Sequence, residues 1–108
     1  MTFNQMDKFI HNVILPEVLK TRTSGQKEYA RDIDDVFHNF RRVASFTGDS
    51  EEKAILTYMV KHMDGVGSYI NGYESQREDV TGRIKDLIVY LMLLWALISE
   101  KKDKNEDG

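Results

Sequence analysis

The chain has 108 residues, of which 15 are Lys or Arg and 18 are Asp or Glu, and it contains no cysteine. This length suits one domain, and the missing cysteines exclude a disulfide scaffold and a Cys-based zinc site and agree with a reducing compartment. The net charge of −3 argues against a protein that coats DNA or RNA, because counterion release needs clustered Lys and Arg. With 41% hydrophobic residues, seven Gly and one Pro, the composition favours a soluble, all-α protein.

The first apolar pattern predicts a helix over residues 3–22. Its apolar residues recur at near-helical spacing, namely Phe3, Met6, Ile10, Val13 or Ile14, and Val18. Pro16 lies inside this pattern, so the helix is expected either to kink there or to restart with Pro16 in its first turn. Residues 21–33 are polar around Gly25 and have no apolar period. We expect a long loop or a short, weak helix there, and this stretch is a candidate wall of a binding site.

A second helix is predicted to begin after Asp34 or Asp35 and to end at Thr47 and Gly48. One of its faces is apolar and consists of Val36, Phe37, Phe40, Val43 and Ala44. The opposite face carries basic residues that are either ordinary surface charges or contacts for an anionic substrate, namely His38, Arg41 and Arg42.

A third helix is predicted from the acidic start at residues 49–52 to about Ile70. Its apolar stripe consists of Ile55, Leu56, Met59, Val60, Met63, Val66 and Ile70, beside a polar stripe of Thr57, Lys61, Asp64 and Ser68. Gly65 and Gly67 lower the helix propensity near its end. They indicate either close approach of a neighbouring helix or ligand, or simply a weakened final turn.

After a turn at residues 71–76, the last helix is predicted over residues 77–98. Residues 77–86 are rich in charge, whereas residues 87–98 carry none. Twelve apolar positions span roughly 18 Å, too short for a bilayer, so we expect a buried helix and a homo-oligomer rather than a membrane anchor. Residues 1–5 do not resemble a secretory signal, and we expect a cytoplasmic protein. The charged residues 100–108 are expected to fray or be disordered, which leaves one helical domain at residues 1–99.

The last two helices are predicted to pack as an antiparallel hairpin. Asp64 lies ten residues before the centre of the turn and Asp86 twelve after it, so both reach a similar depth. The hairpin would present one polar surface made of Lys61, Asp64, Asp79, Arg83 and Asp86. Such a set suits a Mg²⁺-bound phosphate ester, although ion pairs beside the core are the simpler explanation of the spacing. His62 lies on a different face and is expected to be structural.

Several short motifs occur in order along the chain: GQKEYA at 25–30, VFHNF at 36–40, KHMD at 61–64, and SQREDV at 75–80 followed by GRI and Asp86. Over about residues 23–98 this succession resembles small bacteriophage and prophage proteins related to nucleotide-modification-associated domains. More distantly, it is similar to the all-α NTP pyrophosphatases of the MazG and dimeric dUTPase type. The resemblance implies a four-helix bundle, commonly oligomeric, with a Mg²⁺-dependent nucleotide site, and a host-cell cytoplasmic location if the chain is phage-encoded.

The resemblance leads to a hypothesis for each candidate residue. Asp64 and Asp86 would be catalytic, and they would bind Mg²⁺ together with Asp79. Phosphates would be neutralised by Lys61 and Arg83. A base would stack on one of three rings, Tyr29, Phe37 or Tyr90.

The chain departs from the MazG pattern of an E-x-x-E pair followed by an E-x-x-D pair. Arg83 stands three residues before Asp86, where a hydrolytic relative has a carboxylate, so only Asp79 or Glu78 could supply another one on this helix. Two functions therefore remain open for a nucleotide binder: a Mg²⁺-dependent nucleoside triphosphate pyrophosphohydrolase, or a non-catalytic phage protein that sequesters a nucleotide or cyclic-nucleotide signal. A protein-binding inhibitor is a third.

Overall fold

The computed structural model describes residues 1–29, 34–73 and 78–107, without the side chains of residues 28, 29, 106 and 107. Within these ranges every regular element is helical, which confirms the all-α prediction. The elements are α1 (Phe3–Phe9), the π-helical turn η1 (Ile10–Ile14), α2 (Leu15–Tyr29), α3 (His38–Thr47), α4 (Glu51–Ile70) and α5 (Val80–Asp107).

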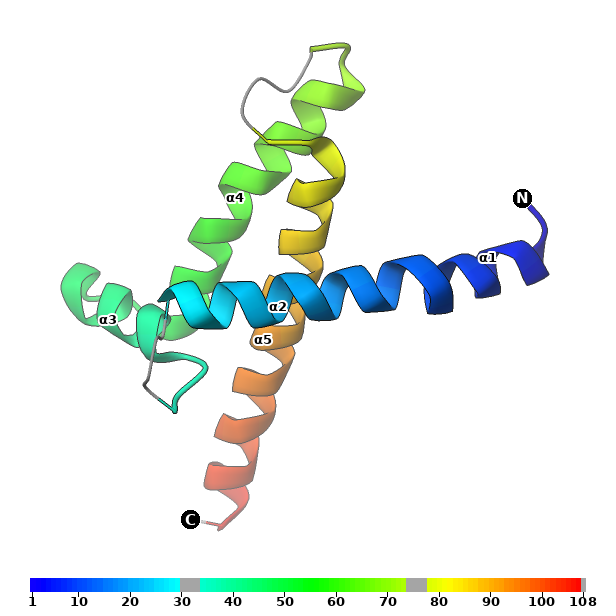
Figure 1. Ribbon diagram of the computed structural model, residues 1–108. Helices are drawn as coiled ribbons and strands as arrows, with labels where there is room; N and C mark the ends of the chain where they lie inside the picture. Colours follow the sequence, from blue (N-terminus) through cyan, green and yellow to red (C-terminus); the bar gives the residue numbers. More distant parts are fainter. Residues whose placement is uncertain (30–33, 74–77, 108) are drawn as a thin grey trace.

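The N-terminal elements α1, η1 and α2 follow one another without a break as a single long helix (Figure 1). It begins with a capping box in which Thr2 and Gln5 each accept a hydrogen bond from the other's backbone N–H. The π-helical turn ends just before Pro16, which lies in the first turn of α2 as one alternative predicted. A wider turn suits this position, because the proline ring would collide with a regular helical carbonyl four residues earlier.

Helix α2 continues through residues 21–29, so the predicted loop is wrong there and the helical alternative is confirmed; residues 30–33 lie outside the described residues. The Thr21 hydroxyl donates to the Glu17 carbonyl, which accommodates a polar β-branched side chain within the helix. The Glu17 carboxylate also forms an ion pair with Lys85 of α5 at 3.1 Å. This ion pair joins the first half of α2 to α5.

Helices α3 and α4 begin and end close to the predicted residues. The Asp35 carboxylate accepts a hydrogen bond from the Phe37 N–H, one residue before α3. Gly48 ends α3 in the left-handed conformation with φ 76°, which glycine adopts without steric cost. Ser50 then caps α4 by accepting from the Lys53 N–H.

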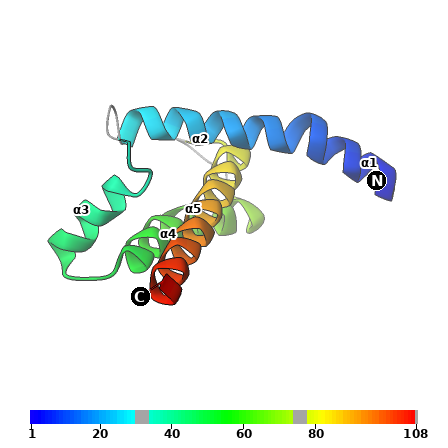
Figure 2. The ribbon, with the colours of Figure 1, turned by 90° about the horizontal axis from the view of Figure 1, so that it is seen from below.

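The helices are arranged around the α4–α5 pair (Figures 1 and 2). Helix α5 runs back alongside α4, while α2 lies across both of them on one side and packs against α5. Helix α3 packs against the N-terminal part of α4. The chain is thus all-helical as expected, but its long N-terminal helix crosses the other helices instead of running alongside them.

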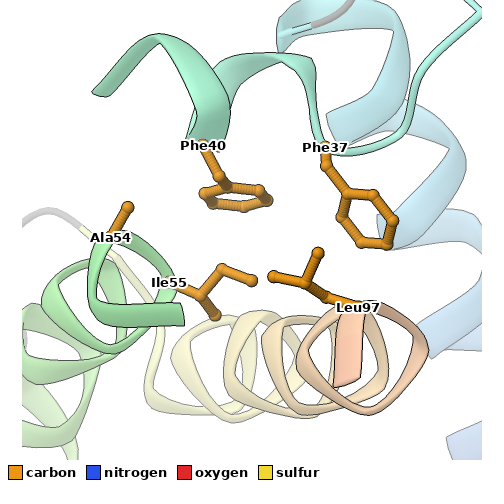
Figure 3. Packing of buried hydrophobic residues seen from close by; sticks show 5 residues of the cluster. All are labelled: Phe37, Phe40, Ala54, Ile55 and Leu97. Carbon is orange, nitrogen blue, oxygen red and sulfur yellow. The ribbon is translucent and has the colours of Figure 1, made fainter. Parts of the chain in front are cut away.

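The core lies where α3, α4 and α5 meet, and Figure 3 shows its five buried residues pointing toward one another: Phe37, Phe40, Ala54, Ile55 and Leu97. Ile55 and Leu97 are 0% and 1% exposed. Helix α2 also packs against α5, and Val18 of α2 and Leu87 of α5 are buried outside this cluster. The apolar face predicted for residues 36–44 therefore does supply part of the core.

Exposed apolar residues recur at helical spacing along both α4 and α5. We call this set the open apolar face; it consists of Leu56, Val60 and Met63 of α4 with Ile84, Leu91, Trp95 and Ile98 of α5. Trp95 has 76% of its surface exposed. The prediction that residues 87–98 form a buried helix is therefore only partly met. Within the described residues, no helix combines the length and the apolar character needed to cross a membrane.

Helix α5 extends to Asp107, through residues expected to fray. Lys101 explains part of this extension, because its ammonium group forms ion pairs with Glu51 and Glu52 at the start of α4. The hydrogen bonds from Lys101 lower the pKa of both carboxyl groups, and those carboxylates in turn raise the pKa of Lys101. Ion pairs between α5 and the start of α4 thus help to keep the charged C-terminal residues helical.

Replacing Lys101 with methionine should reduce the acid sensitivity of the fold. Carboxyl groups with a lowered pKa contribute stability that is present above their ordinary value of about 4.5 and lost as pH falls below it. Without Lys101, the melting temperature should be lower at about pH 7 and fall less on acidification to about pH 3. Lys104→Met is the matched control, because Lys104 pairs with Glu100 within α5. An unchanged acid profile in Lys101→Met would contradict this account.

Candidate functional site

A pocket of about 350 Å³ is lined by four parts of the chain: α2, α3 with the residues just before it, α4, and α5 with the residues just before it. Its walls carry polar and aromatic side chains together: Thr21, Arg22, Gln26, Asn39, Phe40, Thr57, Tyr58, Lys61, His62, Glu78, Asp86 and Tyr90. The polar stretch that was the candidate wall of a binding site does line this pocket, through helical residues of α2.

His62 lies between two carboxylates. Its Nδ1 is 3.7 Å from Glu78 Oε2, and its Nε2 is 3.7 Å from Asp86 Oδ2. Both distances exceed those of a hydrogen bond, and the buried Nδ1 makes none. The residue is 8% exposed, and its ring lies 5.7 Å from that of Tyr90. The three ligand atoms that these residues offer lie within 4.8 Å of one another, so the group could hold a divalent ion.

Arg83 lies beside this group rather than in the pocket wall. Its Nη1 donates to the Lys61 carbonyl at 3.5 Å and is 3.9 Å from Glu78 Oε2. Its buried Nε makes no hydrogen bond. The side chain packs over Gly65, where an added Cβ would come within 2.4 to 2.6 Å of its atoms. Close approach of a neighbouring helix, one of the two alternatives for the glycines, therefore holds at Gly65, whereas Gly67 has nothing within 4 Å.

The two glycines offer a matched pair of variants. Gly67→Ala should raise the free energy of unfolding by about 0.5–1 kcal/mol, the usual difference between glycine and alanine in a helix. Gly65→Ala should give no such gain, because the new methyl group must displace the Arg83 side chain from the Lys61 carbonyl and Glu78. Urea unfolding measures both, and an equal stabilisation would show that Arg83 is not held in place by this contact.

The aromatic part of the pocket consists of three rings. Tyr58 and Tyr90 are stacked, with centroids 6.0 Å apart and an interplanar angle of 17°. Phe40 meets both rings edge-on at 5.7 and 6.1 Å. Asn39 donates a hydrogen bond to the Tyr58 hydroxyl at 3.3 Å, which helps to orient that ring. Such a wall presents both an aromatic surface and hydroxyl groups to a ligand.

The structure brings only some of the predicted residues together. Lys61, Asp86 and Tyr90 line the pocket. Phe37, predicted to stack on a base, is 3% exposed in the core, with the Arg41 guanidinium 5.6 Å from its ring centroid. The side chain of Tyr29 lies outside the described residues.

Asp64 and Asp79 do not line the pocket; both are exposed. Asp64 lies on the same side of α4 as Thr57 and Lys61 but about one turn beyond Lys61, outside the residues that line the pocket. The Asp79 carboxylate accepts a hydrogen bond from the Thr81 hydroxyl, and its backbone carbonyl accepts one from the Arg83 N–H. Asp79 thus helps to start α5. Neither Asp64 nor Asp79 joins Asp86 in the wall of the pocket, in contrast to the polar surface expected from the sequence.

His62 and Glu78 belong to the candidate site but were not among the predicted site residues. His62 was expected to be structural, and Glu78 was only an alternative to Asp79 as a source of a carboxylate. Helical spacing contained the signal for His62, because Ile55, Tyr58 and His62 recur at intervals of three and four on the side of α4 that faces the other helices. Glu78 precedes α5, so a helical pattern could not place it.

No protein-family model, curated protein or solved structure matches this chain, so a functional proposal has to rest on the pocket itself.

Proposed function

We propose that this protein binds a nucleotide, or a phosphate ester derived from one, in the pocket between α2 and the α4–α5 pair. The observation that carries the proposal is the combination of cationic, metal-ligating and aromatic side chains in the wall of one cavity. A volume of about 350 Å³ lies within the usual range of small-molecule sites, roughly 300–1,000 Å³.

The charges suit a phosphate accompanied by a cation. Arg22 on α2 and Lys61 on α4 are exposed residues of the pocket wall and can donate to phosphate oxygens. Glu78 and Asp86 would repel a bare phosphate, so a divalent ion between them and the ligand would favour binding. Mg²⁺ is the ion expected from the sequence resemblance. The stacked pair of Tyr58 and Tyr90 offers the base an aromatic wall.

Binding without rapid hydrolysis is the version we favour. Among the described carboxylates, Glu78 and Asp86 line the pocket, whereas Asp64 and Asp79 do not. The hydrolytic pattern that the sequence resembles supplies four carboxylates. A pyrophosphohydrolase is the second candidate, because a metal ion at His62 and its two carboxylates could activate water.

A thermal-shift panel tests the proposal. Nucleoside mono-, di- and triphosphates and cyclic dinucleotides would be added with Mg²⁺ and, separately, with a chelator. The proposal predicts that at least one compound raises the melting temperature in a concentration-dependent way. Product analysis of that compound after incubation separates binding from hydrolysis. If no compound shifts the melting temperature, nucleotide binding is wrong, and a protein partner becomes the better hypothesis.

We also propose that the chain assembles with a second copy through the open apolar face. The accessible surface of the whole chain is 8370 Å², whereas a compact monomer of 12.6 kDa exposes about 6,200 Å². Its radius of gyration is 16.1 Å, compared with about 13 Å for a compact domain of this length. The excess is roughly 2,000 Å² per chain, or about 4,000 Å² for two copies, which lies within the range of total area that obligate homodimers bury. Apolar residues from two helices supply a face that a symmetric copy can match.

A further inference from the structure

We propose that His62, Glu78 and Asp86 form a binding site for a first-row transition metal ion such as Mn²⁺, Fe²⁺ or Zn²⁺, in preference to Mg²⁺. This deepens the proposed function, because such an ion would meet the phosphate of a bound nucleotide. The ion can nevertheless be tested without any nucleotide, so the two proposals can fail separately.

The buried Nδ1 of His62 is the observation that points to a ligand. The His62 side chain is 10% exposed, yet this nitrogen makes no hydrogen bond while facing the Glu78 carboxylate. A buried polar atom left without a partner costs about 1–3 kcal/mol, so such atoms are rare unless a water or ion is bound there. An ion between the nitrogen and the carboxylate would satisfy both groups.

The separation of 3.7 Å is close to what two ligands of one ion require. Metal bonds of about 2.0–2.1 Å that meet at a tetrahedral angle place a nitrogen and an oxygen ligand about 3.4 Å apart. A movement of a few tenths of an ångström would therefore be enough. Glu78 lies just before α5, and its side chain is 41% exposed, so its carboxylate has room to make this movement.

The opposite side of the ring is also suited to a ligating histidine. When one ring nitrogen binds a metal, the other usually donates to a carboxylate or carbonyl, which fixes the tautomer and the ring orientation. Here Nδ1 faces Glu78 and Nε2 faces Asp86, so a carboxylate is present whichever nitrogen binds the ion. Contact with the Tyr90 ring further restricts rotation of the imidazole.

The donor set favours a transition metal. Imidazole nitrogen suits Zn²⁺, Fe²⁺ and related ions, whereas Mg²⁺ prefers oxygen ligands and retains several waters. With one ring nitrogen and the Glu78 carboxylate as ligands, and Asp86 accepting from the other ring nitrogen, coordination positions remain for water or for a phosphate oxygen of the ligand. The pocket residues Arg22 and Lys61 would then act on the same phosphate from the walls.

Metal titration of the chelator-treated protein tests this site. Calorimetry with Mn²⁺, Zn²⁺ and Mg²⁺, and Co²⁺ absorption spectra as a probe of coordination, should show one transition metal ion per chain, bound at least about tenfold more tightly than Mg²⁺. Glu78→Gln and Asp86→Asn should each weaken binding at least about tenfold. Asp64→Asn is the matched control, because Asp64 is an exposed carboxylate two residues from His62, and it should bind like the wild type.

Two results would overturn the site: no binding of any of these ions, or binding that Glu78→Gln and Asp86→Asn leave unchanged. Mg²⁺ binding as tight as Mn²⁺ binding would overturn the preference. A charged imidazolium held between two carboxylates is the alternative explanation of the geometry, and it predicts the first of these results. A nucleotide-dependent thermal shift in the presence of chelator would then preserve the proposed function while the metal site fails. Circular dichroism of both variants checks that they fold.

Discussion

Replacing Lys61 with glutamate should lower nucleotide affinity by at least about 100-fold. A hydrogen bond between charged groups contributes about 1.5–3 kcal/mol, equivalent to roughly 10–100-fold in affinity. Charge reversal adds repulsion, because the new carboxylate would join Glu78 and Asp86 in the wall of the pocket. Fold stability should change little, since Lys61 is exposed and both residues are good helix formers. Calorimetric titration with the nucleotide that gives the largest thermal shift measures the loss.

Lys53→Glu is the matched control for this variant. Lys53 lies on the same helix, has 68% of its side chain exposed and pairs with Asp49, but it does not line the pocket. It makes the same change in net charge, so a general electrostatic effect would lower affinity equally in both variants. Equal losses, or full affinity in Lys61→Glu, would remove Lys61 from the binding site.

The double replacement of Leu91 and Trp95 by glutamate should convert an oligomer into a monomer. Burying a large apolar side chain stabilises an interface by about 1.5–3 kcal/mol, and each residue occurs in both copies of a symmetric dimer. The dissociation constant should therefore rise by more than about 100-fold. Light scattering coupled to size-exclusion chromatography measures the mass directly.

Phe46→Glu controls for the loss of an exposed aromatic residue. Phe46 is 93% exposed on α3 and is not part of the open apolar face, and its replacement should leave the mass unchanged. A wild-type protein that is monomeric at high concentration would contradict assembly through this face.

Helical periodicity predicted the helices wherever the apolar pattern was regular or the capping residues were clear. Helix α4 starts at its predicted acidic residues and ends at Ile70. Residues 21–29 left a loop or a weak helix open, and residues 100–107 were expected to fray, because neither stretch has an apolar period. The ion pair of Lys101 with Glu51 joins distant parts of the chain, and local patterns do not reveal it.

The candidate site was predicted only in part for a similar reason. The polar surface predicted for the two antiparallel helices included Lys61 and Asp86, and both do line the pocket. Asp64 lies about one turn beyond Lys61 on α4, and it does not line the pocket. Apolar residues were expected to be buried, yet the open apolar face is exposed in a single copy. Periodicity identifies an apolar face but not what covers it.

Mapping of ligand contacts by amide chemical shifts tests the central proposal most directly. The nucleotide selected by the thermal-shift panel would be titrated into isotope-labelled protein. The pocket account predicts that the largest shifts occur at Arg22, Lys61, His62 and Tyr90, while the indole N–H of Trp95, on the open apolar face, changes little. Largest shifts at Trp95 and its neighbours on that face, with the pocket residues unchanged, would contradict it.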